Sequence, residues 1–66
     1  MNKEEAMAAM QIGQKVTHPY FMPHEWITMK DDLIITEEGY ETLASEFWSY
    51  RCSVIWLNDW SVFKDY

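Results

Sequence analysis

Residues 25 to 36 read EWITMKDDLIIT, and this stretch determines the expected centre of the fold. Its first part, 25–30, is rich in residues that favour β-strands, and so is the run 33–35. Asp31 and Asp32 lie between the two runs, and short acidic side chains suit a tight turn because they tolerate its backbone conformations. The pattern predicts an antiparallel hairpin.

A further strand is expected before this hairpin, from Lys15 onward. Val16, His18 and Tyr20 alternate with their neighbours at a period of two, which is typical of a strand. Pro19 cannot donate a backbone hydrogen bond, so this strand should be an edge strand or a short one.

The N-terminal residues predict a helix that starts near Lys3. Asn2 and Glu5 have the spacing of a capping box, in which the side chain of each residue accepts the backbone N–H of the other. Gly13 can take the left-handed conformation that ends a helix. The apolar residues of this segment, Ala6, Met7 and Met10, form a short stripe at helical spacing.

Helical spacing returns after Thr36, where TEEGYETLASEFWSYR predicts a second helix that starts there or near Glu41. Its expected inner face comprises Tyr40, Leu43, Ala44, Phe47 and Arg51. The ending SVIWLNDWSVF predicts a hairpin that turns at residues 57–59. The fold class predicted is α+β: one domain, residues 1–66, with a small antiparallel sheet of three to five strands and two short helices.

Composition limits the possible functions. The chain has 66 residues, 48% of them apolar, which indicates a small folded domain. Cys52 is the only cysteine, so no internal disulfide can form, and we expect it to be buried in a reducing compartment. No apolar run approaches the roughly 18 residues of a membrane span, and we expect a cytoplasmic protein with no membrane partner.

The charge distribution indicates a basic partner. The net charge is −6, and six acidic residues occur between positions 31 and 46 without any Lys or Arg. Such a surface repels phosphate backbones and attracts basic proteins, so direct nucleic-acid binding is disfavoured. The six are Asp31, Asp32, Glu37, Glu38, Glu41 and Glu46.

The stretch THPYFMPHEW, residues 17–26, raises the question of a metal site. His18, His24 and Glu25 could supply three ligands, but adjacent residues on an extended chain point to opposite sides. We interpret the stretch as a strand connection. Cys52 lacks the electropositive setting of a catalytic thiolate, since Arg51 is its only nearby cation. We therefore expect no metal, no cofactor and no enzymatic activity.

Eleven aromatic residues, four of them Trp, exceed what so small a core normally encloses. Two interpretations stay open. Some rings lie at the surface as binding anchors, or most of them form one aromatic core with polar tips reaching water.

Both ends of the chain resemble a known group of proteins. EEAMAAMQIGQKV is similar to the opening of small phage and prophage proteins, in which a helix leads through Gly into a basic-Val strand. Asp59-Trp60 resembles their Asp-Trp ending. Members of the group antagonise host defence: some sequester a cyclic ADP-ribose-type signal of Thoeris immunity, and others inhibit CRISPR effectors. The resemblance implies a compact α+β fold and oligomers with pockets between subunits. This chain has HPYFMP where the group has a Trp-Asn-Gly turn, so no ligand-binding residue is transferred.

The expected function is that of a small acidic phage-type interaction protein in the bacterial host cell. It would inhibit a host defence or nucleic-acid-handling protein by occupying a basic surface. The residues expected to bind the partner are Asp31, Asp32, Glu37, Glu38, Glu41, Tyr40 and Trp48. The alternative is a module that sequesters a nucleotide-like signal at the interface of a homo-oligomer.

Overall fold

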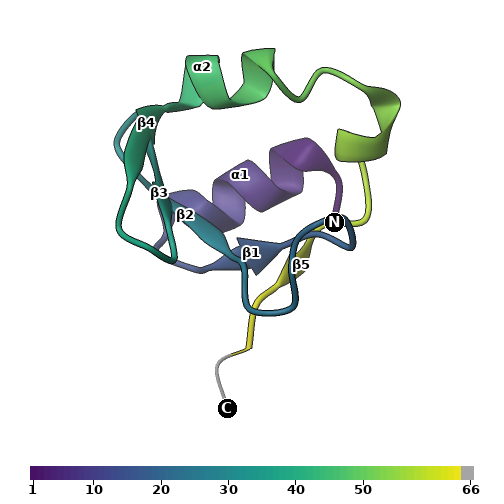
Figure 1. The fold of residues 1–66 in the computed structure, drawn as a ribbon, viewed down its shortest axis with the longest axis horizontal. Helices are drawn as coiled ribbons and strands as arrows, with labels where there is room; N and C mark the ends of the chain where they lie inside the picture. The colour runs from purple at the N-terminus through teal and green to yellow at the C-terminus, as the bar shows by residue number, and fades with distance from the viewer. Residues whose placement is uncertain (65–66) are drawn as a thin grey trace.

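A computed structural model describes residues 1–64 and shows a five-stranded antiparallel sheet with helices on one face (Figure 1). The strand order is β4-β3-β2-β1-β5, so β4 and β5 are the two edges. The predicted α+β class is confirmed. In chain order the elements are α1 (Lys3–Gln11), β1 (Val16–Thr17), β2 (Ile27–Lys30), β3 (Leu33–Thr36), β4 (Glu41–Leu43), α2 (Ala44–Ser49), the 3-10 helix η1 (Val54–Trp56) and β5 (Ser61–Val62).

The predicted central hairpin is confirmed as β2 and β3. Met29 pairs with Ile34 and Lys30 with Leu33, so Asp31 and Asp32 form the turn. Asp31 has a φ of 57°, a left-handed conformation that Asp tolerates better than most residues. Because side chains alternate along a strand, one face of the hairpin turns toward the core.

Helix α1 begins and ends where the sequence indicates. The capping box is complete: the Glu5 backbone N–H donates to the Asn2 side chain at 2.8 Å, and the Asn2 N–H donates to Glu5 at 2.9 Å. Gly13 ends the segment with a φ of 93°. Ala6 and Met10 are fully buried, which places α1 against the sheet.

The expected second helix is only partly correct. Residues 41–43 form the edge strand β4, and the helix α2 begins at Ala44. Two backbone hydrogen bonds explain the difference. The Gly39 N–H donates to the Thr36 carbonyl, and the Thr36 N–H donates to the Tyr40 carbonyl, so the chain turns back along β3. Gly39, with a φ of 87°, therefore belongs to a hairpin turn.

The expected hairpin at the end of the chain is wrong. Residues 54–56 form a 3-10 helix, and β5 pairs with β1 on the far side of the sheet. The segment from α2 to η1 therefore crosses over α1 from one sheet edge to the other, as Figure 1 shows. Strand β1 is short, which is the second of the two outcomes expected from Pro19; it lies between β2 and β5 and is not an edge strand.

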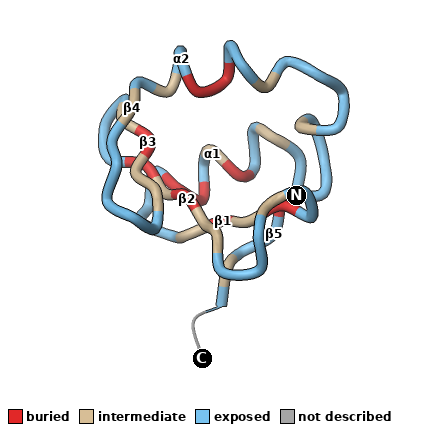
Figure 2. The backbone as a smooth tube through the Cα atoms, viewed as in Figure 1, coloured by how far each residue is buried: buried red, intermediate tan, exposed pale blue. Residues whose placement is uncertain are grey.

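One hydrophobic core lies between the sheet and the crossing segment, and the buried residues in Figure 2 lie on α1, α2 and the strands. It contains Ala6, Ala9, Met10, Val16, Ile27, Met29, Ile34, Phe47, Trp48 and Trp60. Within residues 1–64, no helix has the length and apolar character needed to cross a bilayer.

Candidate functional site

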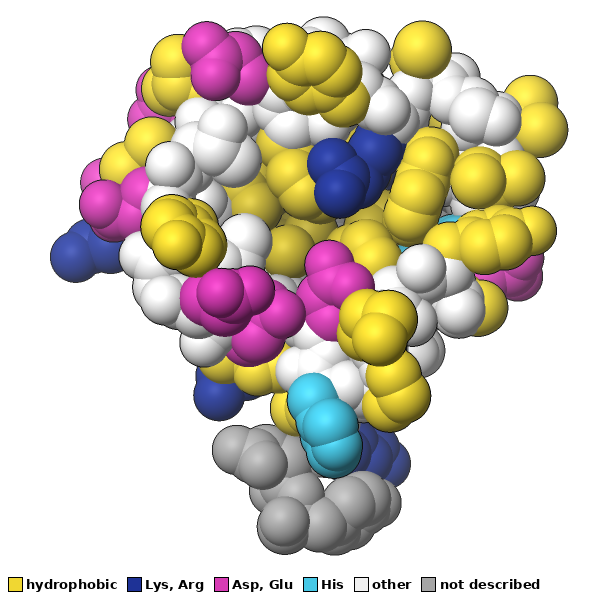
Figure 3. Space-filling model, in the orientation of Figure 1, with side chains coloured by type: hydrophobic (Ala, Val, Ile, Leu, Met, Phe, Trp, Pro, Cys, Tyr) yellow, Lys and Arg dark blue, Asp and Glu magenta, His cyan; other side chains and the backbone are white. Residues whose placement is uncertain are grey.

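Acidic side chains follow one margin of the molecule, which we call the acidic edge. It consists of the six residues Asp31, Asp32, Glu37, Glu38, Glu41 and Glu46, all of which are exposed. They lie on the β2–β3 turn, the β3–β4 turn, the edge strand β4 and helix α2. Figure 3 shows acidic side chains along this margin from α2 downward. The structure therefore brings the predicted acids onto neighbouring elements.

The acidic edge has two ends. Because β3 joins two antiparallel turns, the turn at Asp31 and the turn at Glu38 lie at opposite ends of that strand, about 13 Å apart at a rise of roughly 3.3 Å per residue. Glu41 pairs with Ile35 near the second turn. The Ala44 N–H donates to the Asp32 carbonyl at 2.8 Å, which ties the first turn to α2.

Tyr40 lies in the β3–β4 turn beside the acids and is 70% exposed. Its backbone N–H donates to the Thr36 hydroxyl at 3.2 Å, so the ring projects from an ordered turn. Leu43, further along β4, is also exposed. An exposed ring and an exposed aliphatic side chain flanked by carboxylates suit contact with a partner, because aromatic side chains dominate binding hot spots.

Trp48, the second expected anchor, lies elsewhere. It is only 8% exposed and packs edge-on against Phe47 and Trp60, with ring centroids 5.0 and 5.5 Å away. A buried ring cannot reach a partner without unfolding of α2, so Trp48 is not part of the acidic edge.

Most other rings pack together in what we call the aromatic cluster, formed by His18, Phe21, Trp48, Trp56 and Trp60. Trp60 is its centre: it is 1% exposed, and its indole N–H donates to the Trp56 carbonyl at 2.8 Å. Among residues 1–64, the interpretation of an aromatic core fits the rings of this cluster and Phe47, whereas the tyrosines at 20, 40 and 50 are exposed.

His18 is a structural member of this cluster. It is 3% exposed, and its Nδ1 accepts the Tyr20 backbone N–H at 3.2 Å. The proton therefore lies on Nε2, which faces the carbonyls of Ile55 and Asn58 at 2.8 and 2.9 Å. The imidazole thus fastens the β1–β2 connection to η1. His24 is exposed, and within residues 1–64 no group of three or more potential ligands could hold a metal ion.

A cationic group lies above the aromatic cluster. The Arg51 guanidinium carbon is 4.1 Å from the centroid of the Phe47 ring and 5.4 Å from that of Trp56. Lys3 Nζ is 4.6 Å from the centroid of the Trp48 ring. Burial lowers the pKa of Arg51, and Coulomb attraction to the Glu25 carboxylate partly opposes that shift. Sequence reasoning missed these cation–ring contacts, because Lys3 reaches the Trp48 ring only through the tertiary fold.

Cys52 does not occupy the buried position that the sequence led us to expect. It is exposed and follows the C-terminal end of α2. The chain leaves the core after Arg51 in order to cross toward η1, which carries the thiol outward.

Comparison with known proteins adds no assignment. No family model matches the sequence, and no curated protein or solved structure matches it at a significant level.

Proposed function

We propose that this protein is a small phage-type interaction protein that inhibits a host defence or nucleic-acid-handling protein by occupying a basic surface. The observation that carries the proposal is the acidic edge, six exposed carboxylates on adjoining turns, strand and helix. No Lys or Arg occurs from position 31 to position 50 of the sequence. Acidic side chains outnumber basic ones along this margin, where Lys30 at the end of β2 adjoins the Asp31 turn.

Electrostatics would control the encounter. Complementary charge raises association rates above the neutral range, and the effect falls with added salt because ions screen exposed charges beyond about 8 to 10 Å. The carboxylates themselves add little affinity, since exposed ion pairs contribute about 0 to 1 kcal/mol each. Tyr40 supplies the apolar anchor beside them, with its ring 70% exposed.

The experiment begins with the partner. The protein is immobilised and exposed to bacterial lysate, and proteins that elute between low and high salt are identified. The purified partner is then bound to the wild type, to Glu37→Lys and to Glu4→Lys at several salt concentrations. Both substitutions change the net charge by the same amount, but Glu4 lies on α1, away from the acidic edge.

Glu37→Lys is expected to slow association several-fold at low salt and to flatten its salt dependence, whereas Glu4→Lys should change the rate much less. Tyr40→Ala should instead raise the dissociation rate. Equal effects of the two charge reversals would show that net charge, rather than the acidic edge, governs binding.

A further inference from the structure

Strand β4 pairs along only one of its two sides. It is the last strand of the sheet formed by residues 1–64, and Figure 1 shows it at the margin of the molecule. On its inner side, the Tyr40 carbonyl accepts the Thr36 N–H at 3.0 Å, so the peptide groups of residue 40 point toward β3. This direction alternates along an antiparallel strand, so the N–H groups of Glu41 and Leu43 and the Glu41 carbonyl point outward. These groups can bond a further strand.

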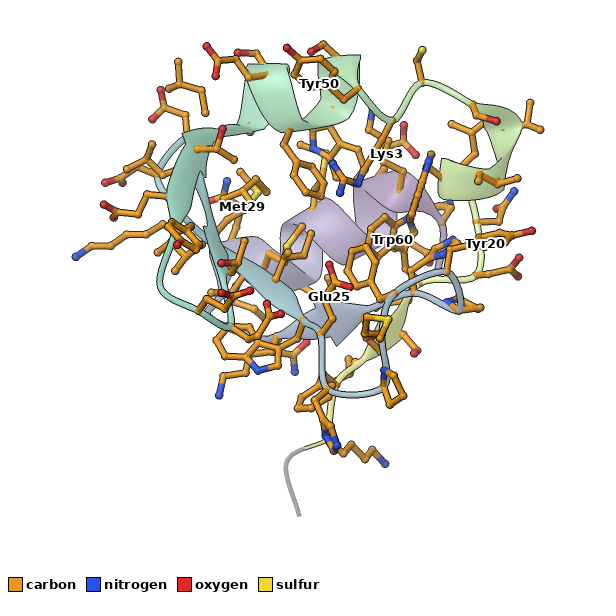
Figure 4. The ribbon with its side chains drawn as sticks, in the orientation of Figure 1. Lys3, Tyr20, Glu25, Met29, Tyr50 and Trp60 are labelled. Carbon is orange, nitrogen blue, oxygen red and sulfur yellow. The ribbon has the colours of Figure 1, made fainter. Side chains whose placement is uncertain are left out.

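The side chains of β4 determine what a further strand would meet. Thr42 shares a cross-strand row with the buried Met29, which Figure 4 shows on the side of the sheet that carries α1. Since side chains alternate, Glu41 and Leu43 lie on the opposite, open face. Leu43 is 45% exposed and pairs there with the half-buried Leu33. A further strand would extend an apolar row at Leu43 and meet a carboxylate at Glu41.

We propose that β4 binds an extended basic segment of the partner protein as an additional strand of the sheet. Strand addition of this kind gains affinity from main-chain hydrogen bonds and specificity from alternate side chains. Antiparallel pairing, the more stable arrangement, places an apolar residue opposite Leu43 and, two residues later in the segment, Lys or Arg opposite Glu41. The inference rests on the proposed function, because the acidic edge is what selects a basic segment.

Charge favours a basic segment over a second copy of this chain. Glu37 and Glu38 lie just before β4 and Glu46 just after it, so two copies paired through β4 would bring like charges together. Charged side chains on a short edge strand are a usual protection against such self-pairing. Lys30 belongs to the Leu43 row but lies two strands away, about 10 Å at a strand spacing of roughly 4.8 Å. A basic segment therefore meets attraction along the whole of β4.

The test uses a blocked synthetic peptide in which Thr residues alternate with Val and Lys residues, and NMR of the isotope-labelled protein. The amide signals of Glu41 and Leu43 are expected to move downfield with saturation, because both N–H groups gain an acceptor. Their hydrogen exchange should slow at the same time. The amide signal of Val62, on the opposite edge strand β5, should stay in place.

Two N-methylated peptides separate backbone pairing from charge attraction. Methyl groups on the Val and Lys nitrogens replace the N–H groups that face β4, and should weaken binding at least tenfold. The same number of methyl groups on the Thr nitrogens, which face away from β4, should change the affinity less than threefold. Both peptides carry the same charge, so equal binding by the two would overturn the proposal.

Two substitutions at position 41 make the same separation in the protein. Glu41→Gln removes the charge alone and should weaken binding about threefold, the effect of losing one exposed ion pair. Glu41→Pro also removes the outward N–H without taking a hydrogen bond from β3, and should weaken binding at least tenfold. Melting curves check that both variants fold. Movement of the Val62 signal instead of the Glu41 and Leu43 signals, or no saturable movement of these two, would also overturn the proposal.

Failure of this inference and failure of the proposed function give different results. A basic host protein that binds in a salt-sensitive way but leaves the Glu41 and Leu43 signals unmoved would retain the acidic edge as the binding surface and overturn strand addition. Peptide binding with the expected pattern, without any basic protein captured from the lysate, would support strand addition and overturn the proposed function.

Discussion

The acidic edge and the aromatic cluster are built in opposite ways. The acidic edge comes from one continuous segment, positions 31 to 46, and every carboxylate in it is exposed. The aromatic cluster assembles rings from the β1–β2 connection, α2, η1 and the residue before β5, and its central ring is 1% exposed. Substitutions in a surface made of exposed, consecutive residues should leave the fold intact, whereas substitutions in a buried cluster that joins distant segments should destabilise it.

The aromatic cluster also explains how so few regular elements hold together. Strands β1 and β5 have two residues each, which is too little pairing to be stable alone. Trp60 precedes β5 and exchanges backbone hydrogen bonds with Met1, while its ring contacts His18 and Trp48. The cluster thus fixes the far edge of the sheet through side chains rather than through a long ladder.

The largest effect is expected for Trp60→Ala. Removing a large buried ring costs about 3 to 5 kcal/mol, and a chain of this length has a total stability of roughly 3 to 10 kcal/mol at 0.05 to 0.15 kcal/mol per residue. The urea midpoint should therefore fall steeply, and with a stability at the lower end of this range the protein would be largely unfolded at 25 °C, as urea denaturation followed by circular dichroism would show. Tyr50→Ala is the control, since that ring is 85% exposed and its loss should change stability by less than about 0.5 kcal/mol.

The two histidines provide the next comparison. His18→Phe keeps a ring in the cluster but leaves the Ile55 and Asn58 carbonyls and the Tyr20 N–H without their partner, which should cost about 1 to 3 kcal/mol. His24→Phe is the matched control and should be nearly neutral, because His24 is exposed. Equal midpoints in urea for the two variants would show that the His18 hydrogen bonds do not secure the β1–β2 connection.

A smaller loss of stability is expected for a substitution in the β3–β4 turn, which carries part of the acidic edge. Thr36→Val removes the hydroxyl that accepts the Tyr40 N–H, and the loss should be about 0.5 to 1.5 kcal/mol, with amide exchange rising first near residues 36–40. Thr42→Val is a suitable control, because it changes the same side chain on β4, where Thr42 is likewise half-buried. A uniform rise in exchange over the whole chain would mean that the turn is not an independent unit.

These contrasts match what the sequence could and could not reveal. The α1 cap and the β2–β3 hairpin depend on residues within a few positions of one another, and both were predicted correctly. Residues 41–43 were assigned to a helix because Tyr40, Leu43 and Phe47 have helical spacing; the Thr36–Gly39 turn and pairing with β3 override that spacing. The periodicity of a segment does not show that a distant strand, here β3, can take its backbone hydrogen bonds and make it a strand instead of a helix.

The same reasoning explains the candidate sites. The acids and Tyr40 were identifiable because they are close in sequence and polar or exposed by type. The burial of Trp48 and the positions of Lys3 and Arg51 over the neighbouring Trp48 and Phe47 rings depend on the chain crossing over α1 after α2, and the run SVIW gave the opposite expectation of a strand. Once that segment was expected to form a local hairpin, no sequence pattern could place positions 3 and 51 over adjacent rings of α2.

The smallest effect on stability is expected for the acidic edge itself, in the double variant Glu37→Gln and Glu38→Gln. Both side chains are exposed, so the change should lie within about 0.5 kcal/mol, and its sign should be stabilising at low salt because the net charge falls from −6 toward −4. Added salt screens the same repulsion, so the wild type should gain stability between low and moderate salt while the variant gains less. Thermal melts at three salt concentrations measure both. A clear loss of stability would mean that these carboxylates support the turn, and the acidic edge would then be part of the fold in the way the aromatic cluster is.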